Sequence, residues 1–328
     1  VNPYFPTRRM KEELESNFEV LMRQYPSGMN VNTLLAAKCF SLHEEHIVIG
    51  NGAAELIKGL LEQLGGTLGV IRPTFEEYPN RWGESCVEYD CTVDNFTYTA
   101  DSLIEYFSRN QINNLVLINP DNPSGHFLSK KEIGKILEWC KTNEINLILD
   151  ESFLDFAEGK NNSLLSERIL CKNPNLYIVK SISKSYGVPG LRLGILASGN
   201  TSMIDYLKNN LSIWNINSMA EFFMQILDKY KDDYRISLEK LKKERKHFYN
   251  ELCGIDNLKV YPSQANYFLC ELLNGLDSKK LAGALLEKNI LIKDLSGKIK
   301  NGKQYIRTAI RTEEENEVLL KNIKNIIE

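Results

Sequence analysis

The chain has 328 residues, which is enough for one large α/β domain or for two domains of average size. Its 43% hydrophobic, 25% charged and 9% aromatic residues are typical of a soluble globular protein and exclude the disordered, collagen-like and coiled-coil classes. The 40 Lys and Arg residues against 43 Asp and Glu residues give a net charge of −3, so we expect no nucleic-acid partner.

Short apolar runs alternate with helical patterns between residues 30 and 205. This alternation is typical of a mainly parallel sheet that helices cover on both faces. We expect helices over residues 53–63 and 130–142, the second introduced by a capping box of Ser129 and Glu132. The predicted strands are residues 46–49, 68–71, 86–89, 115–118, 147–149, 177–179 and 193–196. The first part of the chain is therefore predicted to be an α/β domain.

The pattern changes after residue 201. Residues 219–252 are rich in Lys and Glu and carry apolar residues at helical spacing, which predicts one or two long helices leading out of the first domain. Short strands are predicted at residues 257–261, 266–271, 290–293 and 305–310, and helices at residues 278–288 and 313–327. A smaller α+β domain is therefore predicted to close the chain.

Neither a membrane segment nor a secretion signal stands out in the sequence. The apolar runs fall short of the ~18–20 residues that a membrane-spanning helix needs, and the N-terminus has no charged region followed by an apolar one. The seven cysteines are scattered without a Cys-x-x-Cys pair, which favours reduced thiols over disulfides or a zinc cage. We therefore expect a cytoplasmic protein without a membrane partner.

Residues 181–194 read Ser-Ile-Ser-Lys-Ser-Tyr-Gly-Val-Pro-Gly-Leu-Arg-Leu-Gly and follow a predicted strand. They place Lys184 among hydroxyls and glycines, with Arg192 eight residues later. A lysine at the edge of a sheet can form a Schiff base if its pKa is lowered, and serine hydroxyls with an arginine suit a bound phosphate. From chemistry alone, a glycine-rich surface loop with an exposed lysine explains the segment equally well.

The segment closely resembles the lysine motif of the fold-type I pyridoxal 5'-phosphate (PLP) enzymes. It is most similar to the class I/II aminotransferases of the histidinol-phosphate type and to the threonine-phosphate decarboxylases. The resemblance implies that PLP is the cofactor and that Lys184 forms its Schiff base. It also implies that Ser181, Ser183 and Arg192 hold the phosphate of the cofactor.

The resemblance extends in the right order over essentially the whole chain, from Asn2 to the segment around Arg307. It implies the fold-type I architecture, with a large PLP-binding domain of residues 30–215. Residues 1–29 plus 216–328 would form the smaller domain that closes on the substrate. The active site would lie between the two domains, under a second subunit.

Residues 150–156 read Asp-Glu-Ser-Phe-Leu-Asp-Phe and end a buried strand with a carboxylate. Open α/β sheets bind ligands at the carboxyl ends of their strands, and an aspartate there can pair with the pyridinium nitrogen of PLP. Capping of the next turn is the alternative role of Asp150. The resemblance implies that Phe153 also lies at the cofactor, at a position where the aminotransferases usually have Tyr.

Two loops that follow predicted strands are also assigned to the cofactor. Residues 119–125 have the composition of a turn and are similar to the family's Pro-Asn-Asn-Pro-Thr-Gly loop. The resemblance implies that Asn122 binds the phenolic oxygen of the ring. Asp121 and Ser124 depart from the pattern. The amides of Ala53 and Ala54 begin a predicted helix, where backbone N–H groups can bind an anion. In the family this second loop contacts the phosphate.

Two aromatic residues complete the predicted cofactor site. Phe75 lies in a Pro-Thr-Phe segment that matches the family's Pro-Thr-Tyr, whose ring stacks on PLP. Tyr25 lies in a Tyr-Pro pair whose hydroxyl, in the family, reaches the cofactor phosphate of the neighbouring subunit, so a homodimer is implied. Taken singly, a core phenylalanine and an exposed Tyr-Pro turn are the ordinary explanations.

The predicted substrate-binding residues lie in the smaller domain. Arg307 matches the family's arginine that binds the substrate α-carboxylate, and strict alternation along a strand would put Arg311 on the same face. Aminotransferases usually have Gly at position 311, so Arg311 and Phe153 resemble the decarboxylases. Lys293 stands where both relatives tend to have Arg, and these two cations are not equivalent at a bidentate site.

No metal site is expected. His43 and His46 lie three residues apart, but they lack the His-Glu-x-x-His spacing and a third ligand, so we interpret them as a solvated cap. No Ser-His-Asp or Cys-His pattern of a hydrolase stands out among the four histidines.

The motifs favour an aminotransferase that acts on a small amine or amino acid bearing a phosphate or phosphonate, of the histidinol phosphate or 2-aminoethylphosphonate type, with a keto acid as the second substrate. Threonine-phosphate decarboxylase is the runner-up, and a PLP-binding regulatory module without turnover is the third possibility. The chain opens at Val1 and not at Met, so we expect either missing first residues or a fused upstream domain, such as a nucleotidyltransferase.

Overall fold

The computed structural model describes residues 1–83 and 86–327. Within this part of the chain, the larger sheet has seven strands in the order β1-β7-β6-β5-β4-β2-β3. They are β1 (Ile47–Asn51), β2 (Leu68–Arg72), β3 (Cys86–Asp90), β4 (Asn114–Ile118), β5 (Asn146–Asp150), β6 (Leu176–Ser181) and β7 (Leu193–Ser198). β7 runs antiparallel to β1 and β6, and the remaining pairs are parallel. The predicted α/β fold with a mainly parallel sheet is confirmed.

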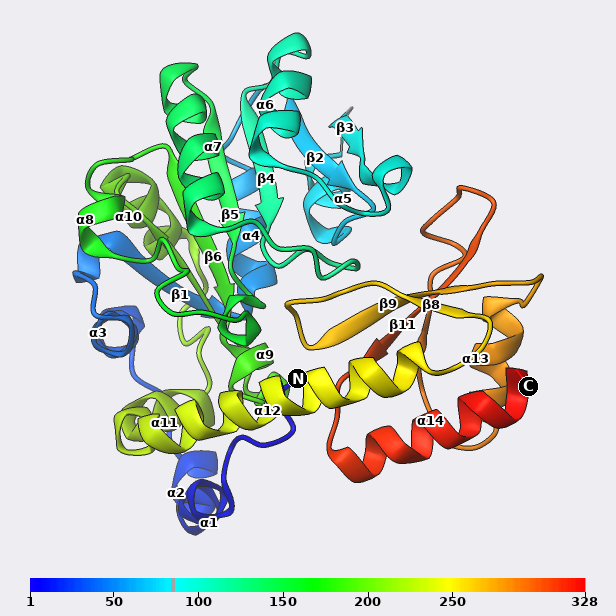
Figure 1. Ribbon diagram of the computed structural model, residues 1–328. Coiled ribbons are helices and arrows are strands. Elements are labelled where there is room, and N and C mark those ends of the chain that lie inside the picture. The colour runs from blue at the N-terminus through cyan, green and yellow to red at the C-terminus, as the bar shows by residue number, and fades with distance from the viewer. Residues whose placement is uncertain (84–85, 328) are drawn as a thin grey trace.

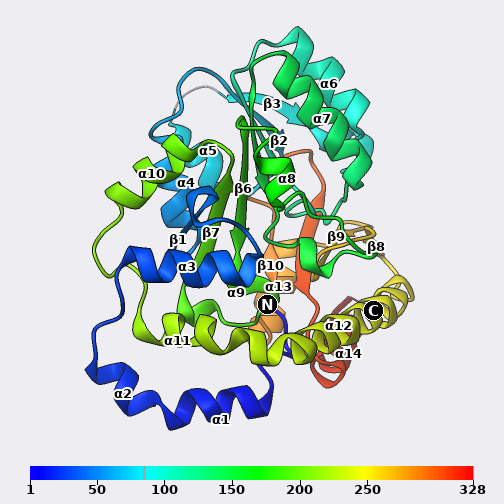
Figure 2. The ribbon, with the colours of Figure 1, turned by 90° about the vertical axis from the view of Figure 1, so that its left-hand side faces the viewer.

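Helices cover both faces of the larger sheet, as Figure 2 shows. One face carries α4 (Ala53–Leu61), α5 (Glu77–Trp82) and α10 (Thr201–Asn210), and the other α6 (Ala100–Arg109), α7 (Lys130–Thr142) and α8 (Glu167–Leu170). The inner strands are therefore buried on both sides, which explains their nearly continuous apolar sequences. The capping box of Ser129 and Glu132 is present at the start of α7. None of the described helices is long and apolar enough to cross a membrane.

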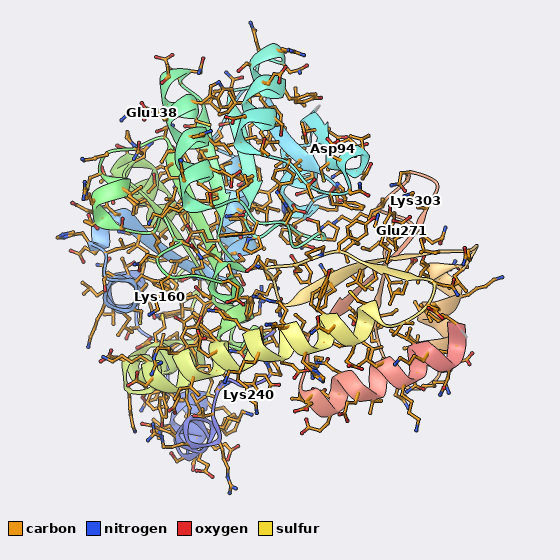
Figure 3. All side chains as sticks on the ribbon, in the orientation of Figure 1. Asp94, Glu138, Lys160, Lys240, Glu271 and Lys303 are labelled. Carbon is orange, nitrogen blue, oxygen red and sulfur yellow. The ribbon has the colours of Figure 1, made fainter. Side chains whose placement is uncertain are left out.

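The smaller sheet is antiparallel and has the order β10-β11-β9-β8. Its strands are β8 (Leu258–Val260), β9 (Tyr267–Leu272), β10 (Lys293–Asp294) and β11 (Gln304–Ala309). Helices α12 (Lys231–Cys253), α13 (Ser278–Leu286) and α14 (Glu313–Ile327) share its apolar core. At its border, Figure 3 shows Glu271 beside Lys303, whose Nζ lies 2.9 Å from the Glu271 carboxylate.

The strand expected over residues 290–293 is wrong for most of its length. The backbone N–H of Ile290 donates to the carbonyl oxygen of Leu285 and so belongs to the end of α13. Leu291 is 84% exposed. The sheet ladder begins only at Lys293, which pairs with Arg307 of β11.

Residues 219–252 were expected to form one or two long helices, and they form two. α11 (Ser218–Leu227) leads through one 3-10 turn (Asp228–Tyr230) into α12, which runs from the larger sheet to the smaller one (Figure 1). The N-terminal helices α1 (Arg8–Ser16) and α2 (Phe18–Arg23) pack against α11, and α3 (Met29–Phe40) packs against β1 and α11. The proposed division into residues 30–215 and residues 1–29 plus 216–328 stays a prediction.

Arg245 of α12 joins the two halves of the molecule. Its side chain is buried, and Nη1 donates to the carbonyl oxygen of Phe156, at 2.6 Å, in the segment that follows β5. The same Nη1 donates to the carbonyl oxygen of Ala265, at 3.2 Å, just before β9. One guanidinium therefore links the larger sheet to the smaller one.

The carboxyl ends of β1, β2, β4, β5 and β6 meet at one edge of the larger sheet. β1 and β6 share a direction because both run antiparallel to β7, so β7 begins where they end. Gly194 accordingly pairs with Gly50 of β1 and with Ser181 of β6. The smaller sheet lies opposite this edge (Figure 1). Open α/β sheets bind ligands at such an edge.

Candidate active site

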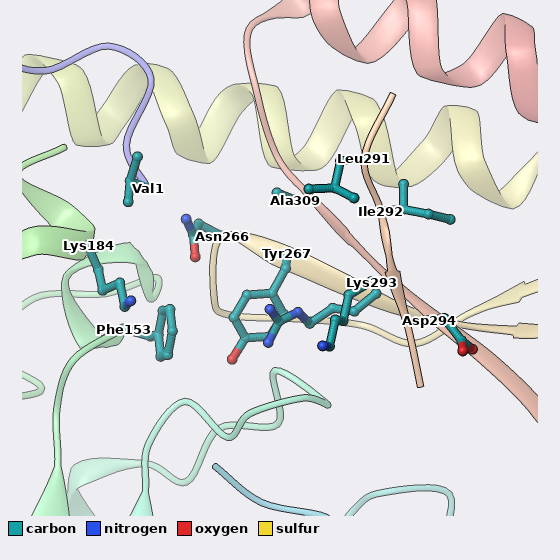
Figure 4. A pocket seen from close by; sticks show the side chains of 11 residues that line it. Val1, Phe153, Lys184, Asn266, Tyr267, Leu291, Ile292, Lys293, Asp294 and Ala309 are labelled. Atoms are coloured by element: carbon teal, nitrogen blue, oxygen red, sulfur yellow. The ribbon is translucent and has the colours of Figure 1, made fainter. Parts of the chain in front are cut away.

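A cavity of about 660 Å³ opens between the edge of the larger sheet and the smaller sheet. Figure 4 shows that side chains from both halves of the molecule face it, with Lys184 and Phe153 on one side and Lys293 on the other. Its lining residues are Val1, Phe153, Lys184, Asn266, Tyr267, Leu291, Ile292, Lys293, Asp294, Arg307 and Ala309. Four predicted site residues, Phe153, Lys184, Lys293 and Arg307, therefore line one cavity.

Lys184 lies in the short helix α9 (Ile182–Ser185), which directly follows β6. Burial lowers the pKa of Lys184, the charges of Arg192 and Arg307 lower it further, and Asp150 acts in the opposite direction. The structure therefore brings four predicted charged residues together, and the lysine among them loses its proton more easily than an exposed lysine does.

The backbone around Lys184 is fixed by the N-terminal segment. The backbone N–H of Asn2 donates to the carbonyl oxygen of Lys184 at 2.9 Å. The side-chain amide of Asn2 donates to the carbonyl oxygen of Ser185 and to the hydroxyl of Ser237 on α12, both at 2.9 Å. The buried Asn2 side chain thus ties α9 to α12.

A buried ionic network lies behind Lys184. Asp155 accepts hydrogen bonds from Lys180 Nζ at 2.7 Å, from the hydroxyl of Ser185 at 2.6 Å and from the hydroxyl of Tyr234 at 2.8 Å. Burial alone would raise the pKa of Asp155, but the charge of Lys180 and these hydrogen bonds lower it overall. Asp155 is therefore an anion that holds β6, α9 and α12 together.

Asp150 ends β5 and is buried. Tyr78 donates its hydroxyl proton to Oδ2 at 2.8 Å, and the backbone N–H of Ser152 donates to Oδ1 at 2.9 Å. Burial raises the pKa of Asp150, while the hydrogen bonds from Ser152 and Tyr78 and the charge of Lys184 oppose that rise. A buried carboxylate held in this way is suited to a cationic partner at the edge of the sheet.

The start of α4 and Arg192 form a cradle for an anion. Gly52 precedes the helix with a φ of 82°, and a Cβ atom at this position would lie 2.3 Å from Nη2 of Arg192. A Cβ atom at Gly194 would lie 2.2 Å from the backbone nitrogen of Ala53. Two glycines therefore let the guanidinium and β7 approach the first amides of α4, those of Ala53 and Ala54, which have no acceptor within the helix.

The two serines of the lysine motif lie at the same edge but in different surroundings. Ser181 is half-buried, and its backbone N–H donates to the hydroxyl of Ser152 at 2.9 Å. Ser183 is buried, and its hydroxyl donates to the carbonyl oxygen of Leu193 at 3.5 Å. Of the two, Ser181 is thus the more open to a ligand.

Asn122 connects the two halves of the cavity. Its Oδ1 accepts a hydrogen bond of 2.5 Å from Nη1 of Arg307, and the guanidinium lies 4.8 Å from the centre of the Tyr267 ring. The two departures from the family's loop pattern interact with each other, since the hydroxyl of Ser124 donates to Oδ2 of Asp121 at 2.5 Å. Burial raises the pKa of Asp121 to about 6.

Lys293 and Arg307 lie opposite each other in the ladder between β10 and β11, and both line the cavity. Arg311 differs from the expectation. β11 ends at Ala309, so the strand alternation does not reach position 311. The guanidinium of Arg311 instead donates to the carboxylate of Glu315 at 2.7 Å, four residues later at the start of α14. Arg311 is not among the residues that line the cavity.

The predicted aromatic residues are placed differently from one another. The Phe153 ring lies edge-on to that of Tyr267, with centres 5.1 Å apart. Phe75 is 39% exposed, and its ring meets Tyr78, the residue that donates to Asp150. Tyr25 is 81% exposed, stacks on Trp214 and does not line the cavity of its own chain.

Sequence reasoning missed three residues of this site. Tyr78 lies in the first turn of α5, three residues after Phe75, and its ring meets that of Phe75. Tyr267 lines the cavity and donates its hydroxyl proton to the carbonyl oxygen of Asp121 at 2.6 Å. Asn266 also lines it, and its buried Oδ1 has no partner among the described residues. Tyr267 and Asn266 lie at the start of a strand that faces a loop of the other half of the molecule. No pattern in the sequence indicates this contact.

The interpretation of the histidine pair as a solvated cap is wrong for His46. Its side chain is 8% exposed, and Nδ1 is hydrogen-bonded to the carboxylate of Glu167. His43 is exposed. The buried position follows from packing of the turn before β1 against α8, which is 121 positions away in the chain.

A family model described as aminotransferase class I and II matches residues 22–323. The chain belongs to this family. The resemblance stated from the motifs is confirmed, because threonine-phosphate decarboxylases and histidinol-phosphate aminotransferases are among its relatives in this family.

Two members of the family are similar to the chain over 99% of its length, each at 31% identity. One is a CMP-5'-(3-aminopropyl)phosphonate synthase of Streptomyces rubellomurinus, and the chain spans only 52% of its length. The other is an L-serine phosphate decarboxylase of Campylobacter jejuni, of which the chain covers 86%. A solved decarboxylase from Sulfurospirillum multivorans superposes with a TM-score of 0.90 at 31% identity, over all of this chain and 86% of that one.

Members of the family use PLP, and PLP is therefore the cofactor of this chain. The residues present fit it. The cradle of Gly52, Arg192 and the first amides of α4 would hold a phosphate. The buried carboxylate of Asp150 would pair with a protonated ring nitrogen, and the amine of Lys184, with its lowered pKa, would attach to the aldehyde carbon.

Proposed function

We propose that the chain is a PLP-dependent decarboxylase of a small amino acid that carries a phosphate or phosphonate, of the serine phosphate or threonine phosphate type. The distribution of cations around the cavity carries this proposal. Lys293 and Arg307 form one pair on adjacent strands of the smaller sheet, and both line the cavity. Arg311, the third cation predicted for the substrate, is engaged by Glu315.

A substrate of this type brings two anionic groups into the cavity. Its phosphate is the more highly charged of the two, at about −1.5 to −2 near pH 7, so the Lys293–Arg307 pair would bind the phosphate. Among the described cavity residues, Lys184 is the remaining cationic side chain, and its amine would be bound to the cofactor. No further arginine among the residues that line the cavity would then be available to the α-carboxylate.

The missing arginine favours decarboxylation for a simple physical reason. A carboxylate held by an arginine fork is stabilised as an anion, and this stabilisation is lost when the group leaves as neutral carbon dioxide. A carboxylate without that partner has less ground-state stabilisation to lose. The absence of such a partner would therefore lower the barrier to breaking the bond between Cα and the carboxylate.

The residues of the larger sheet would serve the cofactor. When bound, PLP supplies an electron-poor ring that accepts the electron pair left at Cα. Asp150 would keep the proton on the ring nitrogen, and Asn122 would offer its Nδ2 group to the phenolic oxygen. Lys184, displaced by the substrate amine, would deliver a proton to Cα after the carboxylate has left. Phosphate binding would fall to Ala53, Ala54, Ser181, Ser183 and Arg192, with Phe75 and Phe153 beside the ring.

Relatives in the family support this choice. Two of them, at 31% and 32% identity over nearly the whole chain, are named L-serine phosphate decarboxylases. The solved structure with a TM-score of 0.90 is also named a decarboxylase. The phosphonate synthase is 31% identical over 99% of the chain, which is why the proposed substrate class includes phosphonates.

Transamination, which the motifs favoured, stays the second candidate. Arg307 lies in the cavity with its guanidinium held by Asn122 and Tyr267, a preorganised fork that also suits a carboxylate. A histidinol-phosphate aminotransferase of Ruminiclostridium cellulolyticum is 28% identical over 90% of the chain. In this case the substrate would be histidinol phosphate or 2-aminoethylphosphonate, with a keto acid as the acceptor.

The two reactions separate in one experiment, because 2-aminoethylphosphonate has no carboxylate to lose. We expect the purified PLP-loaded chain to release carbon dioxide and phosphoethanolamine from L-serine phosphate and to leave 2-aminoethylphosphonate unchanged. Conversion of the cofactor to its amine form by 2-aminoethylphosphonate or histidinol phosphate, without carbon dioxide from serine phosphate, would establish transamination instead. PLP binding without turnover of any of these amines would favour the regulatory module.

Lys184→Ala supplies the control for the site. The variant should lose the visible absorption of the bound cofactor and all turnover, whereas Lys240→Ala, at an exposed lysine of α12, should lose neither. If Lys184→Ala turned over serine phosphate at the normal rate, the proposed site would be wrong.

We further propose that the chain acts as a homodimer, as family members typically do. Exposed large apolar side chains follow one another along α2, α3 and the segment before α11: Phe18, Val20, Met22, Tyr25, Val31, Leu34, Ile213 and Trp214. Tyr25 lies in this group and so could reach the cofactor of a second subunit. Analytical ultracentrifugation of the PLP-loaded chain should give twice the mass of one chain, and a monomer with full activity would refute the proposal.

A further inference from the structure

A second group of ligand-type side chains lies at the end of β1 that is far from the active site. His46 ends the short 3-10 turn (Glu44–His46) that leads into β1. Glu167 is the first residue of α8, and Cys171 directly follows the last. One ligand atom from each of these three residues lies within 4.8 Å of the others: a ring nitrogen of His46, a carboxylate oxygen of Glu167 and Sγ of Cys171. His46 therefore gains, from a distant part of the chain, the further ligands that its own segment lacks.

We propose that His46, Glu167 and Cys171 form a binding site for a divalent transition-metal ion, with Zn²⁺ as the ion it fits. Tetrahedral Zn²⁺ has bonds of about 2.0–2.3 Å, which places its ligand atoms roughly 3.3–3.8 Å apart. The Sγ atom of Cys171 lies 3.6 Å from Oε1 of Glu167. The Nδ1 atom of His46 is hydrogen-bonded to the same oxygen, and separating the two to the spacing around an ion takes a shift of about 1 Å.

The surroundings hold two of the ligands in place. The His46 side chain is 8% exposed, and the backbone N–H of His43 donates to Oε2 of Glu167 at 3.0 Å, which orients the carboxylate as outer-shell partners do. Glu167 and Cys171 are four residues apart along a helical turn and so share a face. Cys171 is exposed, which leaves the fourth position open to water.

The charge and the type of the ligands agree with this ion. One nitrogen, one oxygen and one sulfur ligand suit Zn²⁺ and not Mg²⁺ or Ca²⁺, which take oxygen ligands. The carboxylate of Glu45 lies 3.9 Å from Nε2 of His46 and adds negative charge beside the site. On binding, the ion replaces the hydrogen bond between His46 and Glu167, and the thiol proton of Cys171 is released to water.

Equilibrium dialysis of the PLP-loaded, EDTA-treated chain against Zn²⁺ tests the proposal. We expect about one Zn²⁺ per chain and, because loss of an outer-shell partner alone costs about 10–100-fold in affinity, a weakening of at least about 100-fold in His46→Gln and in Cys171→Ser. Cys253→Ser, which removes another exposed thiol, should bind as the unchanged chain does. Saturating Zn²⁺ should also slow alkylation of Cys171 and leave that of Cys253 unchanged.

Cys171→Ser keeps the test decisive if His46→Gln fails to fold, since Cys171 is exposed. The proposal is overturned if the unchanged chain binds no stoichiometric Zn²⁺, or if Cys171→Ser binds it as tightly. The absorption of the cofactor should not differ between these variants, because the three ligands lie at the opposite end of β1 from the cradle at Gly52.

Discussion

Replacing Asp155 with Asn tests the network that holds Lys184 in place. The substitution keeps the size of the side chain but removes the negative charge from Lys180, whose side chain is 6% exposed. Breaking a buried ion pair by removing one partner costs about 3–5 kcal/mol, because the other charge stays buried without compensation. At about 2 °C per kcal/mol, the lower end of the range for larger domains, the midpoint of thermal unfolding should fall by roughly 6–10 °C.

The assay is thermal unfolding of Asp155→Asn, Lys180→Met and the double variant. The double variant should be more stable than Asp155→Asn, because no unpaired charge remains. The pKa of Asp155 is lowered in the folded chain. Its contribution to the free energy of unfolding is therefore present above the ordinary pKa of about 4 and is lost as the pH falls through the lower pKa of the folded chain. The difference between the unchanged chain and Asp155→Asn should therefore be constant from about pH 5 to 8 and narrow only below about pH 4. A fall of less than about 2 °C, or additive effects in the double variant, would refute the reasoning.

Three further predictions concern the active site. Gly52→Ala should weaken PLP binding at least about 10-fold in a cofactor titration, because its Cβ would lie 2.3 Å from Arg192 and its φ is 82°. The control is Gly134→Ala, whose Cβ would meet nothing within 4 Å, and equal PLP affinities of the two variants would contradict the proposed phosphate cradle. Tyr78→Phe removes a hydrogen bond that favours ionised Asp150, so the pKa of Asp150 should rise and the acid limb of the pH–activity profile should move to higher pH. An unchanged acid limb would show that Tyr78 does not influence the reaction through Asp150. Lys293→Gln should raise KM for serine phosphate about 10-fold or more with a smaller change in kcat, and a change confined to kcat would show that Lys293 does not bind the phosphate.

The large sheet could be predicted because its strands carry their own signal. A strand buried on both faces needs apolar residues at nearly every position, as in β4 and β7, and so the sequence marks it. Short exposed elements carry no such signal. β10 consists of two residues, and its position is decided by pairing with Arg307 and by the end of α13, neither of which is local to the strand.

The predicted site residues likewise divide into those whose positions follow from the predicted strands and those whose positions depend on distant contacts. Lys184, Asp150 and Asn122 follow predicted strands, and parallel strands bring their carboxyl ends to one edge, so their proximity follows from the fold. Arg311 could not be placed by counting along a strand, because the strand ends at Ala309 and Glu315 attracts the guanidinium. The buried state of His46 depends on Glu167, and no local pattern reports a contact over 121 positions.

Arg245 has a consequence for how a substrate could be enclosed. Its guanidinium binds carbonyl oxygens that belong to both halves of the molecule. Arg245 therefore helps to fix the distance between Lys184 in one half and the Lys293–Arg307 pair in the other, although it does not line the cavity. A swing of the smaller sheet as a free flap would break these bonds. Any closure that preserves them has to pivot about this side chain, so a neutral replacement at position 245 should alter the selection between substrates of different length and leave cofactor loading unchanged.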